Sequence, residues 1–148
     1  MNAPGSYRRP YMTLVADEPE TARRLTRMLL AHGAPSVRWL DGSDQSMAEL
    51  VGLLQAIEEQ PDLLVIGMMS SAEATASMIR CVRSAPGGRL LPIAALLPGT
   101  DRQLHEMQFA AGANVVVERL VEDSDYRREA ARLVSYWVRT QRLNALGA

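Results

Sequence analysis

The chain has 148 residues, an apolar fraction of 47% and a net charge of −1. This length and composition fit one globular domain with a substantial core, exclude a disordered chain, and give no overall charge that would attract nucleic acid or anionic membranes. The chain contains 16 arginines and no lysine. Mechanisms that require a lysine amine, such as Schiff-base formation, are therefore excluded.

Alternating apolar segments divide the chain into predicted strands and helices. The polar first ten residues, with two prolines and a glycine, predict a flexible leader at 1–10, followed by a single domain at 11–143 and a tail at 144–148. Short apolar runs predict strands at 11–16, 36–40, 61–67, 91–97 and 113–118. Segments with apolar residues at helical spacing predict helices at 17–33, 46–60, 71–84, 100–111 and 126–143.

The order of these segments predicts an α/β fold. Continuously apolar strands that alternate with helices are typical of a parallel sheet covered on both faces. We predict a doubly wound, five-stranded parallel sheet of flavodoxin-like order 2-1-3-4-5. No segment approaches the ~20 apolar residues of a membrane span, and no apolar N-terminal run precedes a cleavage site, so we expect a cytoplasmic protein without a membrane partner.

Three segments resemble the receiver domain of two-component response regulators. VADEP (15–19) resembles the acidic motif that follows the first strand of that family. PDLLVIGMMS (61–70) is similar to the third-strand motif, in which an aspartate follows a run such as PDLLVI, and AAGANVVVERL (110–120) resembles the segment in which AGA leads to a lysine and a proline. The resemblance covers roughly residues 11–140 and implies a (βα)5 fold and a role in bacterial signal transduction.

The resemblance also implies phosphorylation of an aspartate with Mg²⁺, which needs a nucleophilic carboxylate, acidic metal ligands, a hydroxyl and a cation. The corresponding positions in this sequence are Ala16 and Asp17 (acidic pair), Gly67 (phosphoacceptor), Leu97 (hydroxyl), Arg119 (lysine) and Leu120 (proline). Glycine cannot accept a phosphoryl group, and one acid makes a weak Mg²⁺ site. We therefore predict a degenerate pseudo-receiver that has no metal, no cofactor and no enzymatic activity.

Several residues near the altered positions have alternative interpretations. We hypothesise that Arg119 forms an ion pair with Asp17 across the vacant pocket. Asp17 and Glu18 also suit the N-terminal cap of the first helix. Met68 and Met69 are expected to fill the space left by the missing aspartate. The single cysteine, Cys81, is expected to be a buried apolar residue.

The last predicted helix carries the candidate interaction residues. The resemblance implies that partners bind the face formed by the last two predicted helices, 100–111 and 126–143, and the strand 113–118 between them. Arginine and tyrosine are enriched at binding hot spots, and this helix contains Arg127, Arg128, Arg132, Tyr136 and Arg139. We predict a phosphorylation-independent protein–protein interaction module that binds a signalling or regulatory protein or forms a homodimer through the helices 100–111 and 126–143. We expect Trp137 to lie in the core.

Two other functions remain as alternatives. A small-ligand sensor could use Arg119, Arg127, Arg128 and Arg132 to bind an anion such as a cyclic dinucleotide. An enzyme of another flavodoxin-like family is the less favoured alternative, because the sequence has no glycine-rich phosphate loop, HExxH or GxSxG motif. DNA binding is not expected, because we see no output domain after the last helix and the net charge is slightly negative.

Overall fold

The computed structural model, which describes residues 10–67, 69–119 and 126–147, contains the predicted alternation of strands and helices. Residues 1–9 of the predicted leader lie outside the described residues, as do Met68 and Leu120. The strands are β1 (Met12–Val15), β2 (Val37–Leu40), β3 (Leu63–Gly67), β4 (Ile93–Pro98) and β5 (Val115–Arg119). The helices are α1 (Pro19–Ala31), α2 (Asp44–Leu54), the short 3₁₀ helix η2 (Ile57–Glu59), α3 (Ala72–Ser84), α4 (Arg102–Ala111) and α5 (Arg127–Gly147).

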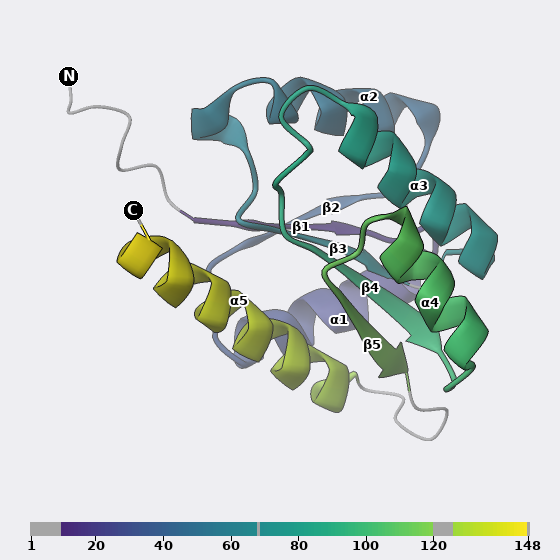
Figure 1. The fold of residues 1–148 in the computed structure, drawn as a ribbon. Helices are drawn as coiled ribbons and strands as arrows, with labels where there is room; N and C mark the ends of the chain where they lie inside the picture. The colour runs from purple at the N-terminus through teal and green to yellow at the C-terminus, as the bar shows by residue number, and fades with distance from the viewer. Residues whose placement is uncertain (1–9, 68, 120–125, 148) are drawn as a thin grey trace.

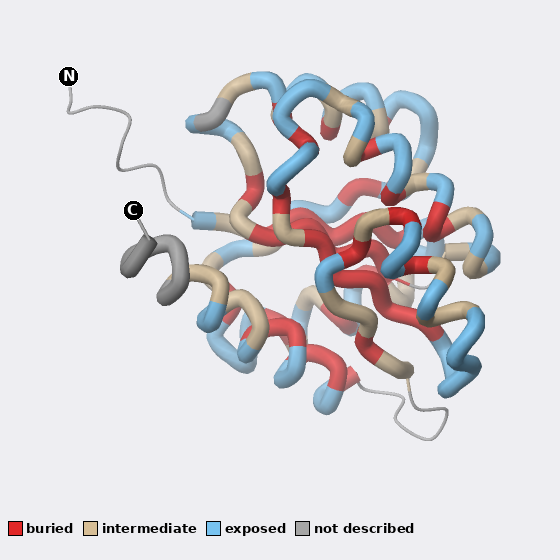
Figure 2. Tube along the Cα trace, viewed as in Figure 1, coloured by how far each residue is buried: buried red, intermediate tan, exposed pale blue. Residues whose placement is uncertain are grey.

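All five strands form one parallel sheet in the order β2-β1-β3-β4-β5, which confirms the predicted fold. Helices α1 and α5 cover one face, and α2, α3 and α4 cover the other (Figure 1). Because successive strand residues point to opposite faces, each strand contributes to both halves of the core. Figure 2 shows the buried residues concentrated in the strands and on the inner sides of the helices. Among the described residues, no helix is long and apolar enough to cross a membrane.

The two halves of the core have distinct compositions. On the first face, Leu14 of β1, Leu96 of β4 and Leu25 of α1 belong to one cluster, which extends to Leu133 of α5. Trp137, expected in the core, is partly buried and packs against the edge of this cluster. The cluster on the other face includes residues of β3, α2 and α3: Leu64, Ile66, Leu50, Leu54, Ile79 and Val82. Both faces of the sheet are therefore buried, as expected from its apolar strands.

The predicted second helix was wrong at both ends. It begins at Asp44 because the Ser43 side chain caps it, accepting a hydrogen bond from the backbone N–H of Ser46. It ends at Leu54 because the side-chain amide of Gln60 donates to the Leu54 carbonyl over 2.9 Å. That carbonyl is thereby satisfied without a further helical turn.

Two more predictions differ from the structure. Helix α5 continues to Gly147, beyond its predicted end near residue 143 and into the predicted tail. The segment from 141 to 146, QRLNAL, contains no proline or glycine that would interrupt the helix. Cys81 is exposed rather than buried, because α3 turns its neighbours Ile79 and Val82 toward the sheet instead.

Arg83 of α3 connects the loops that lead into β4 and β5. Its guanidinium donates to the carbonyl oxygen of Gly112 through Nε (3.0 Å) and Nη2 (2.7 Å). It also donates to the carbonyls of Gly88 (2.9 Å) and Leu91 (2.6 Å) and to Oδ1 of Asn114 (2.8 Å). One side chain thus satisfies carbonyl groups from two loops that are distant in the sequence.

The substitution Arg83→Ala should lower the free energy of unfolding by about 1–3 kcal/mol, because partly buried carbonyls lose their donors. Arg80→Ala provides a matched control, because Arg80 is an exposed arginine of the same helix, and we expect it to change stability by less than ~0.5 kcal/mol. Urea unfolding followed by circular dichroism measures both variants. Equal unfolding midpoints for the two variants would refute this role of Arg83.

Candidate functional site

The altered positions lie at the carboxyl edge of the sheet. β1 is followed by Ala16, which is buried, and by Asp17, which is exposed. Val15 pairs with Ile66, so the chain after β1 runs beside the end of β3 at Gly67. On the other side of β3, Gly67 pairs with Leu96 of β4. The fold therefore brings the end of β1, Gly67 and the end of β4 together, where ligands of doubly wound sheets bind.

Gly67 lies beneath α1, in apolar surroundings. A Cβ atom at this position would lie 3.6 Å from Cδ1 of Leu14, 3.8 Å from Cδ2 of Leu25 and 3.9 Å from Cδ2 of Leu96. These are ordinary van der Waals distances, so packing does not require glycine here. A side chain at this position would start among leucine methyl groups, which disfavour a carboxylate.

Met69 does not occupy the space at Gly67, contrary to the expectation from the sequence. It packs against the core cluster on the opposite face of the sheet, together with Met47 and Met78. Its Cε lies 2.8 Å from the position of a Cβ on Gly42, so it covers the loop after β2. The leucines fill the surroundings of Gly67 instead.

The retained acid, Asp17, forms a local link between two loops. Its Oδ2 accepts a hydrogen bond of 3.1 Å from the backbone N–H of Ser70. The adjacent carbonyl of Ala16 accepts a hydrogen bond of 2.8 Å from the indole of Trp39, a residue that the sequence analysis did not single out. Within the described ranges, no group of three or more histidine, cysteine, aspartate or glutamate residues is placed to hold a metal ion.

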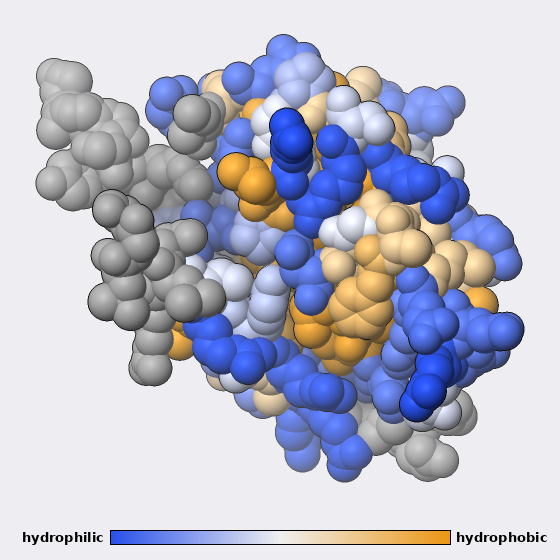
Figure 3. Space-filling model, in the orientation of Figure 1, coloured by the Kyte–Doolittle hydropathy of each residue, from blue (hydrophilic) through white to orange (hydrophobic). Residues whose placement is uncertain are grey.

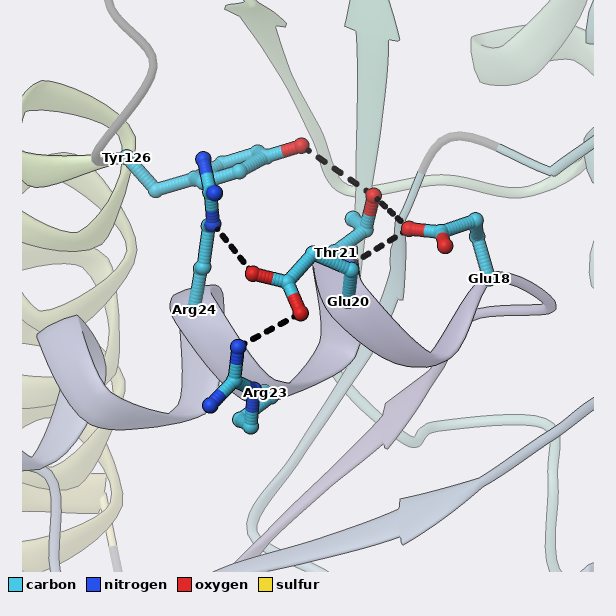
Figure 4. A network of polar contacts seen from close by, with 6 residues as sticks. All are labelled: Glu18, Glu20, Thr21, Arg23, Arg24 and Tyr126. Atoms are coloured by element: carbon cyan, nitrogen blue, oxygen red, sulfur yellow. Dashed lines mark hydrogen bonds and ion pairs between the residues drawn. The ribbon is translucent and has the colours of Figure 1, made fainter.

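Glu18, rather than Asp17, is the N-cap of α1. Its Oε1 accepts hydrogen bonds from the backbone N–H (2.7 Å) and the hydroxyl (2.9 Å) of Thr21. These bonds lower the pKa of Glu18, the backbone bond contributing most. Figure 4 shows this cap beside the ion pairs of Glu20 with Arg23 and Arg24. Two acids at the start of α1 thus have structural partners within the helix.

Arg119, at the end of β5, interacts with the start of α5. Its Nη1 lies 3.7 Å from Oε2 of Glu129, the Arg119 side chain being 13% exposed and that of Glu129 0%. Its Cζ lies 3.8 Å from the centroid of the Tyr126 ring. We call Arg119, Tyr126 and Glu129 the Arg119 cluster. The hypothesis of an ion pair with Asp17 was wrong, because among the described residues the guanidinium contacts Glu129 of α5 and the ring of Tyr126, which directly precedes that helix.

The Arg119 cluster is tied to α1 through Tyr126. The phenol O–H of Tyr126 donates a hydrogen bond of 3.4 Å to Oγ1 of Thr21. The Thr21 hydroxyl in turn donates to the carboxylate of Glu18 (Figure 4). Tyr126 is buried and has a φ of 63°, in the left-handed region that non-glycine residues rarely adopt. The sequence analysis missed Glu129, although its position four residues before the buried Leu133 was a visible signal that it lies toward the inward side of α5.

The predicted interaction residues lie on α5, but they do not form a single site. Arg127, Arg128, Arg132 and Arg139 are exposed, and Tyr136 is partly buried. Arg132, Tyr136 and Arg139 line a groove of about 270 Å³ beside β5, whereas Arg127 and Arg128 do not. Burial raises the pKa of the Tyr136 phenol, and the nearby Arg139 and Arg83 partly oppose that shift. Figure 3 shows apolar surface over β5 and α4, bordered by hydrophilic side chains of α5.

The sequence matches no protein-family model and no curated protein. Solved structures do match, among them a response regulator receiver domain from Rhodospirillum rubrum with a TM-score of 0.70, 16% sequence identity and coverage of 83% of this chain and 89% of that one. This chain has the receiver fold. The chemotaxis protein CheY4 of Vibrio cholerae has the same fold, with a TM-score of 0.66, 15% identity and coverage of 90% and 99%. A response regulator from Hahella chejuensis has a TM-score of 0.66, 21% identity and coverage of 86% and 94%.

Three of the altered positions lie at or near the ends of β3, β4 and β5 in this receiver fold. The end of β3 holds Gly67, β4 holds the buried Leu97, and β5 ends at Arg119. Leu97 carries no group that can form a hydrogen bond to a phosphoryl oxygen. These residue types do not supply the nucleophile and the hydroxyl that the sequence resemblance associates with the fold.

Proposed function

We propose that this protein is an atypical response-regulator receiver domain that acts in signal transduction by binding a protein partner, without phosphorylation at the end of β3. The partner binds the α4–β5–α5 face, and the domain catalyses no reaction and binds no DNA. The observation that carries this proposal is the position of Gly67, which lies among Leu14, Leu25 and Leu96 at the carboxyl edge of the sheet.

Independence from phosphorylation is supported by the surrounding groups as well as by the glycine. Asp17 is bound to the backbone of Ser70. Arg119 lies against Glu129 and Tyr126. The groups that would have to meet a phosphorylated side chain and its metal ion are therefore engaged in contacts within the protein. The contacts of Arg119 also hold α5 to β5.

Binding through the α4–β5–α5 face is supported by its composition. The exposed side of α5 presents arginines, and Tyr136 is partly accessible. On α4, Phe109 is 50% exposed. Exposed aromatic and arginine side chains beside an apolar surface are typical of binding hot spots.

Photo-crosslinking in cells of the source organism tests this proposal. A photoreactive amino acid is placed at Phe109 on α4 or at Ala131 on α5, with Ala48 on α2 as an exposed control position. We expect a discrete crosslinked partner from α4 and α5 and none from α2, and a homodimer would appear as crosslinking to a second copy. Equal crosslinking from α2, or none from either test position, would refute the proposed face.

The small-ligand alternative receives less support from the structure. The groove beside β5 has a volume of about 270 Å³, below the ~300–1,000 Å³ of sites for drug-sized molecules. A cyclic dinucleotide is larger than most such molecules. Calorimetric titration with cyclic dinucleotides tests the alternative, and saturable heat from the folded protein would make a ligand sensor the better interpretation.

A further inference from the structure

The groove between β5 and α5 combines an apolar floor with a cationic rim. We call it the β5–α5 groove. Its floor is formed by Val115 and Val117, which lie on the same side of β5 because strand side chains alternate. Its wall is one side of α5, formed by Ala131, Arg132, Ser135, Tyr136 and Arg139. The spacing of these residues places them along about two turns of the helix.

The charge of the β5–α5 groove is positive. Arg132 and Arg139 line it, seven residues apart on one face of the helix, and both are exposed. Its lining contains no aspartate or glutamate among the described residues. The nearby acid Glu129 is buried and directed toward Arg119. The Tyr136 phenol, whose pKa is raised by burial, stays neutral near pH 7 and can donate a hydrogen bond.

We infer that the β5–α5 groove binds an acidic segment of a protein partner. A carboxylate of that segment lies between Arg132 and Arg139, and a neighbouring apolar side chain packs on the partly exposed Val115. Guanidinium groups bind carboxylates through short, charge-assisted hydrogen bonds of fixed geometry. This inference rests on the proposed function and names the chemistry of the partner.

The size and charge of the groove favour this occupant over two others. A volume of about 270 Å³ accommodates anchoring side chains rather than a whole dinucleotide. A symmetric contact between two copies, centred on the groove, would bring the arginines of both copies together, and like charges at an interface are repulsive. An acidic segment of a different protein can place single side chains in this volume and carries the opposite charge.

Selection from a random peptide library displayed on phage, with the full chain as bait, tests the inference. The test variant is Arg132→Glu/Arg139→Glu. The control variant Arg27→Glu/Arg80→Glu carries the same charge change at exposed arginines of α1 and α3. Circular dichroism verifies that both variants are folded.

We expect the selected peptides to be enriched in aspartate and glutamate next to apolar residues. Their affinity should fall at least ~10-fold in the test variant and remain within about twofold in the control. Amide chemical shifts of Val115 and Ser135 should change on binding. Peptides without acidic enrichment, equal binding by the two variants, or no selected peptide at all would overturn the inference.

Together, the peptide selection and the crosslinking experiment distinguish failure of this inference from failure of the proposed function. If crosslinking from Phe109 still captures a partner while the peptide selection fails, only the acidic occupant of the groove is refuted. If crosslinking fails at α4 and α5 as well, the proposed interaction face is refuted with it.

Discussion

Replacing Gly67 with aspartate should destabilise the protein by about 2–4 kcal/mol at neutral pH and should not make it a substrate for acetyl phosphate and Mg²⁺. The new side chain would start between Leu14, Leu25 and Leu96, at distances of 3.6 to 3.9 Å from their methyl groups. A carboxylate that leaves water for these surroundings loses hydration without gaining a partner. The resident acid and cation are already engaged, Asp17 by Ser70 and Arg119 by Glu129.

The variant Gly67→Ala is the matched control for this substitution. Its methyl group makes only ordinary contacts, so we expect stability within about 1 kcal/mol of the wild type. The destabilisation by aspartate should shrink as the pH falls toward ~4, because the buried acid has a raised pKa and its protonated form is less costly to bury. Urea unfolding at two pH values and intact-mass spectrometry measure these effects. A Gly67→Asp protein with wild-type stability and a phosphoryl adduct would contradict the account.

Replacing Glu129 with glutamine should lower the free energy of unfolding by about 2–4 kcal/mol, because it removes the charge of a fully buried carboxylate that lies 3.7 Å from the largely buried guanidinium of Arg119. The Arg119 side chain is 13% exposed and that of Glu129 0%, so solvent screens this pair weakly. Glu20→Gln is the control, since Glu20 forms exposed ion pairs on α1. We expect that control to have little effect on stability, because exposed ion pairs are screened by solvent.

A double-mutant cycle isolates the interaction between Arg119 and Glu129. The double variant Arg119→Met/Glu129→Gln should be more stable than the sum of the single effects predicts, because the interaction between these two side chains can be lost only once. Hydrogen exchange should also rise in the first turn of α5 in the single variant Glu129→Gln, where the Arg119 cluster joins β5 to α5. Additive effects in the cycle, with unchanged exchange, would show that the Arg119 cluster does not hold α5.

The fold could be predicted from the sequence because its signal is local. Apolar strands such as 63–66 and helices closed by a cap and a glycine are visible in short windows. The prediction failed where a distant side chain decides the outcome. Gln60 ends α2 through a hydrogen bond to Leu54, and no propensity of the helix itself indicates that contact.

The candidate site was only partly predictable for the same reason. The sequence placed Gly67, Asp17 and Arg119 at strand ends, and the sheet order then brings those ends to one edge. The surroundings of Gly67 come from three separate elements, β1, α1 and β4. The partner of Arg119 also depends on how α5 approaches β5, so a plausible pair with Asp17 was proposed in its place.

Intact-mass spectrometry tests most directly whether this protein acts without phosphorylation. The wild-type protein is incubated with acetyl phosphate and Mg²⁺ beside a receiver domain that has its phosphoacceptor aspartate. We predict a phosphoryl adduct on that domain and an unchanged mass for this protein. A stable phosphoryl adduct on this protein would contradict the claim and would require another residue at the carboxyl edge to accept the group.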